Sequence, residues 1–149
     1  MDEIDLAILD HLCKNSRMHS TEIATDLELA TSTVHKRIEK MRETGVIKEF
    51  TVKVDTAEVG LNVTTFIGVN IEQSKRINIL NRLKGIDDVL EIYELLEPYD
   101  MLLKVRTFDI HSLKENVLQV IGNMDGIKDS QSILTTKCHK ERSCVILQK

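Results

Sequence analysis

The residues between Thr31 and Arg42 have the side chains best suited to binding a nucleic acid. Lysine and arginine donate hydrogen bonds to guanine and neutralise phosphates, while small hydroxyl groups allow close approach to base edges. Such residues on the outer face of a short helix are typical of a helix that enters the major groove of DNA. The candidate DNA-binding residues are Thr31, Ser32, Thr33, His35, Lys36, Arg37, Lys40 and Arg42.

Within this set, the side-chain types indicate different roles. Lys36 suits the hydrogen-bond acceptors of guanine, whereas Arg37, Lys40 and Arg42 suit backbone phosphates. His35 is interpreted as a polar side chain that faces the groove, in preference to a pH sensor or a ligand-binding residue. The alternative for the whole set is an ordinary solvated helix whose charges only confer solubility.

The apolar spacing around this segment predicts three helices that hold the candidate residues in place. A first helix is expected over residues 2–14, a second one capped by Ser20, and a third one capped by Thr31 or Ser32. The helix-turn-helix then spans Thr21 to Lys40. The expected apolar sides consist of Ile4, Ile8, Leu12, Ile23, Ala24, Leu27, Val34, Ile38 and Met41.

The segment that follows, residues 46–55, is rich in alternating apolar and polar side chains. This pattern predicts a short strand pair, which would be the wing of a winged helix-turn-helix. Lys48 and Lys53 on this wing either touch DNA or are surface charges. The DNA-binding domain is therefore expected over residues 1–55, and Gly60, Leu61 and Asn62 indicate a hinge over residues 56–62.

From residue 63 the pattern changes and indicates a second domain, residues 63–149. Its strands are expected over residues 63–71, 89–96, 101–107 and 128–137, with a further edge over residues 144–147. Its helices are expected over residues 73–84 and 110–123, with Ile77, Leu80, Leu83, Leu113, Val117, Val120 and Ile121 buried. The order β-α-β-β-α-β is the ferredoxin-like arrangement.

The fold class expected for the whole chain is therefore α+β, with an N-terminal winged helix-turn-helix followed by a C-terminal ferredoxin-like βαββαβ domain. The two helices of the second domain cover only one face of its sheet. Because an exposed apolar sheet is prone to aggregate, we expect a partner subunit to cover the other face.

Composition and charge narrow the classes of protein further. An apolar content of 42% with 30% charged residues argues against a disordered chain. No apolar run approaches the roughly 18 residues that span a bilayer, the first residues are acidic, and the three cysteines are widely spaced. We therefore expect a cytoplasmic protein with no membrane partner.

The net charge is −4, and residues 1–55 contain eight basic against eleven acidic side chains. Positive charge is concentrated in residues 31–44, where four basic side chains face only two acidic ones. Because the positive charge is focused in this way, specific DNA binding with modest non-specific affinity is expected.

Sequence motifs for catalysis or cofactor binding are not found. The chain has no phosphate-binding glycine loop, nucleophile elbow or His-Glu-x-x-His sequence. Cys138, His139 and Cys144 have a spacing that matches no standard zinc site. We therefore expect no catalytic residue, no metal site and no cofactor.

Two motifs connect the chain to a known family. The first helix contains Ile-Asp-x-x-Ile-Leu from Ile4, and the helix-turn-helix ends in Lys-Arg-Ile-Glu-Lys-Met-Arg-Glu-Thr-Gly-Val-Ile-Lys, residues 36–48. Together with the β-α-β-β-α-β order, these motifs closely resemble the Lrp/AsnC (feast/famine) family of transcription regulators. The similarity extends from Ile4 to about Thr136, and it implies that the C-terminal domain is of the RAM/ACT type.

The resemblance also implies partners. These are double-stranded DNA with a roughly palindromic site, further copies of the chain in a homodimer, tetramer or octamer, and an amino-acid effector sensed at subunit interfaces. Tyr99 and Asp100 match the family pattern and are the candidate effector-binding residues, with Asp100 pairing with the effector amino group and Tyr99 forming a wall. A simple turn is the alternative, since Pro98 and Asp100 are common turn residues. Glu97 and Pro98 depart from the family, which commonly has glycine there.

Two other functions are compatible with parts of this pattern. A decarboxylase of the modified-tetrapyrrole type resembles the same two-domain fold but has no need of a basic third helix. A regulator that acts chiefly by recruiting a transcription initiation factor is also consistent with the sequence. The basic residues of the third helix favour a DNA-binding regulator over the enzyme.

Overall fold

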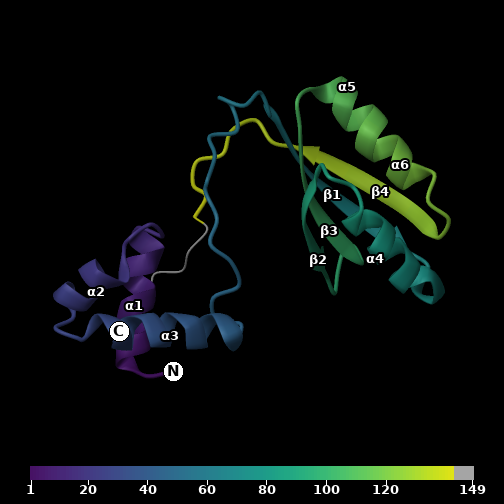
Figure 1. Ribbon diagram of the computed structural model, residues 1–149. Helices are drawn as coiled ribbons and strands as arrows, with labels where there is room; N and C mark the ends of the chain where they lie inside the picture. The colour runs from purple at the N-terminus through teal and green to yellow at the C-terminus, as the bar shows by residue number, and fades with distance from the viewer. Residues whose placement is uncertain (143–149) are drawn as a thin grey trace. The chain divides into compact units, whose positions relative to one another are not determined.

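The structure, a computed structural model, describes residues 1–142 of the chain. By their internal contacts, these residues form two compact units (Figure 1). Of the described residues, the first unit consists of residues 1–53 and 140–142, and the second consists of residues 54–139. Each unit has its own hydrophobic core.

The first unit contains three helices, α1 (Glu3–Lys14), α2 (Ser20–Asp26) and α3 (Thr31–Glu43). Asp2 is the N-cap of α1, because its side chain accepts the Asp5 N–H while the Asp5 side chain accepts the Asp2 N–H. The predicted apolar sides meet in one core, in which the most buried residues are Ile8, Leu12, Ile23, Ala24, Val34 and Met41.

The turn between α2 and α3 is tight. Glu28 has φ 54°, in the left-handed region, and the Leu29 N–H donates to the Ala24 carbonyl at 2.8 Å. The expected caps lie one position too late, since the structure has His19 before α2 and Ala30 before α3. The helix-turn-helix geometry itself agrees with the prediction.

The predicted strand pair over residues 46–55 does not form among the described residues. Ile47 packs on the helical core, but Phe50, Val52 and Val54 are 49%, 76% and 50% exposed. Between Val46 and Asp55 the chain has no glycine, asparagine or proline to make a hairpin turn. The alternating pattern therefore has no complementary strand within its own segment.

The second unit contains a four-stranded antiparallel sheet of β1 (Val63–Ile71), β2 (Val89–Glu94), β3 (Met101–Thr107) and β4 (Ile127–Leu134). The strand order is β2-β3-β1-β4. The first crossover is the single turn η1 (Gln73–Lys75) followed by α4 (Arg76–Lys84), and the second is α5 (Ile110–Ser112), the π-helical η2 (Leu113–Leu118) and α6 (Gln119–Gly122). This is the predicted ferredoxin-like arrangement. The edge expected over residues 144–147 lies outside the described residues.

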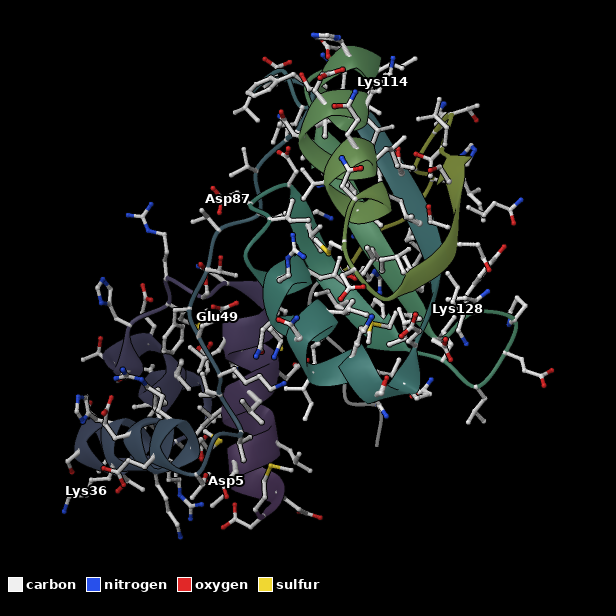
Figure 2. The ribbon with its side chains drawn as sticks, turned by 90° about the vertical axis from the view of Figure 1, so that its right-hand side faces the viewer. Asp5, Lys36, Glu49, Asp87, Lys114 and Lys128 are labelled. Atoms are coloured by element: carbon white, nitrogen blue, oxygen red, sulfur yellow. The ribbon has the colours of Figure 1, made fainter. Side chains whose placement is uncertain are left out.

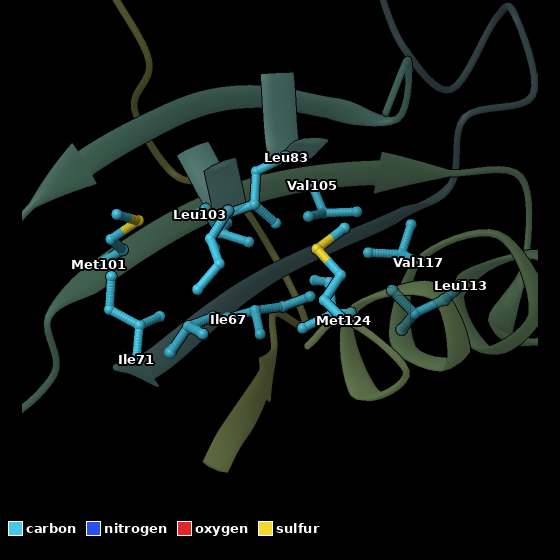
Figure 3. Close-up of a cluster of buried hydrophobic side chains, with 12 residues drawn as sticks. Ile67, Ile71, Leu83, Met101, Leu103, Val105, Leu113, Val117 and Met124 are labelled. Atoms are coloured by element: carbon cyan, nitrogen blue, oxygen red, sulfur yellow. The ribbon is translucent and has the colours of Figure 1, made fainter. Parts of the chain in front are cut away.

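The core of this unit lies between one face of the sheet and both helical segments (Figure 3). Ile67 and Ile71 from β1 and Leu103 from β3 pack against Leu83 of α4 and Val117 of η2. Among the sheet residues on this face, Thr65 is fully buried and its hydroxyl has no hydrogen-bond partner within the described part of the chain.

Two predicted core residues point outward instead. Ile77 is 77% exposed and Val120 is 36% exposed, whereas Ile79 is fully buried. Ile77, Leu80 and Leu83 are three residues apart, and this spacing drifts off the apolar side of a helix that has about 3.6 residues per turn. The side that faces the core contains Ile79, Leu80 and Leu83, and the prediction therefore misplaced Ile77.

The other face of the sheet carries the alternate residues of each strand. Phe66 lies opposite Ile133, and Tyr93 lies opposite Leu102. Tyr93 and Ile133 are each about half exposed, at 50% and 51%. We call Phe66, Tyr93, Leu102 and Ile133 the open sheet face.

Among the described residues, no helix is long and apolar enough to cross a membrane.

Candidate nucleic-acid interface

All eight candidate DNA-binding residues lie on α3 or at its first turn. Thr33 and Arg37 are half-buried, and the other six are exposed. Burial of Val34 and Met41 fixes the opposite side of the helix in the core, so the polar side faces outward. The eight residues thus lie around the part of α3 that is outside its buried side, and four of them, Thr33, Lys36, Arg37 and Lys40, line one cleft. We call this outer part of the helix the α3 face.

Two lysines are available on the α3 face. Lys36 and Lys40 are one helical turn apart and exposed, and Figure 2 shows Lys36 extending away from the helix. Both line an open cleft of about 460 Å³, whose other walls are Met1, Asp2, Asp5, Thr33 and Arg37. Within residues 1–142, no carboxylate lies within ion-pair distance of either ammonium group.

The Arg37 guanidinium is occupied by carboxylates from α1. Its Nη1 lies 2.7 and 2.9 Å from the two carboxylate oxygens of Asp2 and 2.7 Å from Asp5 Oδ1. The hydrogen bond from Arg37 is the main cause that lowers the pKa of Asp5, and the hydrogen bonds to Asp5 and Asp2 raise the pKa of Arg37. Sequence periodicity did not reveal this contact, which joins residues 32 and 35 positions apart.

Arg42 is held more loosely. It forms an ion pair with Glu39 at 3.1 Å, one turn earlier on the same helix. Both side chains are about half exposed, and such surface pairs contribute little to stability. A DNA phosphate can therefore replace Glu39 as the partner of Arg42 at small cost.

The candidate effector residues lie in the hairpin between β2 and β3. The Asp100 carboxylate accepts the Ile71 N–H at 2.8 Å and the Gln73 side-chain amide at 3.0 Å. The Tyr99 ring lies on Gly68, and its hydroxyl hydrogen-bonds Gln131. Both predicted residues thus lie beside the end of β1, although Asp100 already accepts one hydrogen bond at each carboxylate oxygen.

A second polar cluster lies at the turn before β4. Lys75 pairs with Asp125 at 2.7 Å and with Glu72 at 3.3 Å, and these partners raise its pKa. Gly126 has φ 94°, and a Cβ there would lie 2.8 Å from Lys75 Cδ. Asn123, Asp125 and Gly126 were predicted to form a turn here, but the ion pair of Asp125 with Lys75, 50 positions away, was not predicted.

The cysteine and histidine residues give no metal centre among the described residues, where no group of three or more suitable ligands comes together. Cys138 is exposed and unpaired. Cys144, whose spacing from Cys138 matches no standard zinc site, lies outside the described residues.

Comparison with known proteins agrees with both units. Residues 1–48 match the family of winged helix-turn-helix DNA-binding domains, and residues 64–145 match the Lrp/AsnC ligand binding domain. The HTH-type transcriptional regulator FL11 of Pyrococcus furiosus is 34% identical over 95% of this chain and 93% of its own length. The regulatory protein AsnC of Haemophilus influenzae is 31% identical over 91% of each chain.

Solved structures share the whole architecture. The structure of Escherichia coli AsnC superposes with a TM-score of 0.88 at 26% identity and covers 97% of both chains. A transcriptional regulator from Neisseria meningitidis, solved as a complex with L-Met, superposes with a TM-score of 0.90 at 23% identity over 97% of this chain and 96% of its own. The chain belongs to the Lrp/AsnC family of DNA-binding transcriptional regulators.

Proposed function

We propose that the α3 face of this regulator binds a roughly palindromic DNA site as part of a homodimer. The observation that carries the proposal is the pair Lys36 and Lys40, which are exposed, one turn apart and without a carboxylate partner among residues 1–142. A helix anchored on one side in a hydrophobic core and basic on the other is suited to the major groove.

The proposed contacts follow from the positions of the side chains. Thr31, Ser32 and Thr33 at the start of α3, with His35 and Lys36, are proposed to meet base edges. Lys40 and Arg42 are proposed to neutralise phosphates near the end of the helix. In this function the protein acts in the cytoplasm and is not an enzyme, and recruitment of transcription machinery is compatible with it.

The test is in-vitro selection of bound DNA, followed by affinity measurements on the selected site. Lys40→Ala is expected to weaken binding and to lower the slope of log K against log salt by about 0.9, because it removes a phosphate contact. Lys36→Ala is expected to weaken binding and to relax the base preference at the position it contacts. Lys14→Ala is the matched control, because Lys14 is an exposed lysine at the far end of α1, paired with Asp10. If all three variants bind like the parent protein, α3 is not the DNA-binding helix.

The open sheet face supports the proposed homodimer. Phe66, Tyr93, Leu102 and Ile133 are apolar or aromatic and form two facing pairs, Phe66 with Ile133 and Tyr93 with Leu102, in adjacent rows of the sheet. The Lys104–Glu91 pair on the same face, at 3.0 Å, leaves only 14% of the Lys104 side chain exposed. A second copy of this face would bury the apolar residues and leave each charge with a partner. Tetramers and octamers would follow from further contacts between dimers.

An amino-acid effector is proposed from the family of the second domain, with Tyr99 and Asp100 as its candidate contacts. Each Asp100 oxygen accepts one hydrogen bond in this structure, and a carboxylate oxygen accepts two. The carboxylate therefore keeps capacity for an ammonium group. The regulator from Neisseria meningitidis crystallised with L-Met is consistent with an effector of this class.

A further inference from the structure

The contact between Arg37 and the first turn of α1 is different from the other charged contacts of the α3 face. Three carboxylate oxygens from two residues surround a single nitrogen, each within 2.9 Å. The Arg37 side chain is only 28% exposed, and that of Asp5 only 15%. A partly buried and multiply bonded ion pair is more rigid than a surface pair.

The same two carboxylates also begin α1. The Asp2 carboxylate accepts the Asp5 N–H at 2.9 Å, and the Asp5 carboxylate accepts the Asp2 N–H at 3.0 Å. These two hydrogen bonds hold both carboxylates in place independently of Arg37. Arg37 therefore connects the N-terminal end of α1 to the middle of α3. A change in this contact would alter the orientation of one helix against the other.

Transfer of Arg37 to a DNA phosphate would be unfavourable. Asp5 would then be a half-buried carboxylate without a cation, next to a second negative group. The lowered pKa of Asp5 and the raised pKa of Arg37 agree with a stable pair. Lys36 and Lys40 have no carboxylate partner among the described residues and are free to contact DNA.

We propose that Arg37 is a positioning residue, which is held by Asp2 and Asp5 and sets the orientation of the α3 face without contacting a phosphate itself. The inference rests on the proposed role of α3 in DNA binding. According to this inference, Asp2 and Asp5 increase the affinity for DNA, although both residues are acidic and DNA is negatively charged. Their role is to orient Lys36, Lys40 and Thr33 on the other wall of the cleft.

The test measures affinity of the full chain for the selected site and for random DNA, over a range of salt concentrations. Arg37→Gln is expected to weaken binding to the selected site by about tenfold while leaving the salt slope unchanged. Lys40→Ala, measured in parallel, is expected to lower the slope by about 0.9. Random DNA is expected to bind Arg37→Gln and the parent protein equally, to within about twofold.

Asp5→Asn is expected to change the affinity for the selected site in opposite directions, depending on whether Arg37 is a positioning residue or contacts a phosphate. If Arg37 is a positioning residue, Asp5→Asn weakens binding to the selected site severalfold, and the Arg37→Gln, Asp5→Asn double variant is no weaker than Arg37→Gln alone. If Arg37 contacts a phosphate, removal of the nearby carboxylate strengthens binding. If Asp5→Asn does not fold, Asp2→Asn takes its place in this test, because it removes one carboxylate from Arg37 but keeps the hydrogen bond between Asp5 and Arg37.

The outcomes separate this inference from the proposed function. A salt slope that falls by about 0.9 in Arg37→Gln, or tighter binding in Asp5→Asn, overturns the positioning role and leaves the α3 face intact. A slope that is also unchanged in Lys40→Ala, together with unchanged affinity in both Lys36→Ala and Lys40→Ala, overturns the α3 face itself, and the inference is overturned with it.

Discussion

The aromatic ring of Tyr99 lies against the backbone of Gly68, so closely that a Cβ at Gly68 would be 2.3 Å from Tyr99 Cδ2. Gly68 lies in the middle of β1, where it is paired with Leu102 and Gln131 on the two neighbouring strands. The absence of a side chain at this point allows the hairpin residue Tyr99 to cover β1 and reach Gln131.

Gly68→Ala is therefore expected to displace Tyr99 and to destabilise the protein by about 1–3 kcal/mol, because the added methyl overlaps with an aromatic ring. Urea unfolding measures this change. In a Tyr99→Ala background the same substitution is expected to cost much less, since the obstacle is gone. Equal costs in both backgrounds would show that Tyr99 is not the neighbour that excludes a side chain.

Asp100→Ala is expected to lower stability by roughly 1–3 kcal/mol, because the Ile71 N–H loses its acceptor. It is also expected to abolish any thermal shift that an amino acid causes in the parent protein. Gln73→Ala, which removes only the side-chain donor, is the control and is expected to keep the shift. A response that survives Asp100→Ala would place the effector elsewhere.

Ile79 and Ile77 form a matched pair on α4, one fully buried and the other 77% exposed. Ile79→Ala is expected to cost about 2–5 kcal/mol, because it leaves a cavity in the core of the sheet domain. Ile77→Ala is expected to change the free energy of unfolding by less than about 0.5 kcal/mol. Similar costs for the two variants would mean that the register of α4 is different.

Assembly is tested on the open sheet face. Phe66→Asp combined with Ile133→Lys places charges on a facing pair of residues, and it is expected to convert the proposed dimer to a monomer. Light scattering coupled to gel filtration measures the mass. The matched control is Phe108→Asp, since Phe108 is exposed but lies outside the open sheet face. A double variant that keeps the mass of the parent protein would contradict the proposed interface.

The Asp5–Arg37 pair predicts a pH dependence in acid. The hydrogen bond from Arg37 holds the pKa of Asp5 below its ordinary value, so the pair stabilises the folded state above about pH 4. This stabilisation is lost as the pH falls through the lowered pKa. Tm measured between pH 7 and pH 2 is expected to fall less steeply in acid for Asp5→Asn than for the parent protein. Parallel curves would argue against the pair.

Much of the architecture was predictable from local pattern. The strands at residues 63–71 and 101–107 begin and end where alternation predicts them, because one face of each is buried under helices and the register is fixed by burial. The helix-turn-helix was predictable for a similar reason, since each helix has a single apolar side. Where burial of one side determines the structure of an element, the period of its apolar residues is sufficient to predict that element.

The errors and omissions have two causes, which are local geometry and contact between distant residues. Ile77 was misplaced because a spacing of three residues drifts off the apolar side of an α-helix, and the wing was predicted from alternation that has no partner strand in its own segment. The Arg37 contact with Asp2 and Asp5 and the Tyr99 contact with Gly68 both join segments about 30 residues apart. Periodicity within a segment contains no information about such pairs.

The buried hydroxyl of Thr65, which faces the core without a hydrogen-bond partner among residues 1–142, has an evolutionary consequence. A valine has nearly the same shape and no polar atom to leave unsatisfied, so the fold has an unused margin of stability at this position. Selection acts on proteins only until they are stable enough to work, and margins of this kind are then left in place. A change from threonine to valine at position 65 would allow a lineage to tolerate destabilising changes elsewhere, such as those that alter which DNA sequence is bound.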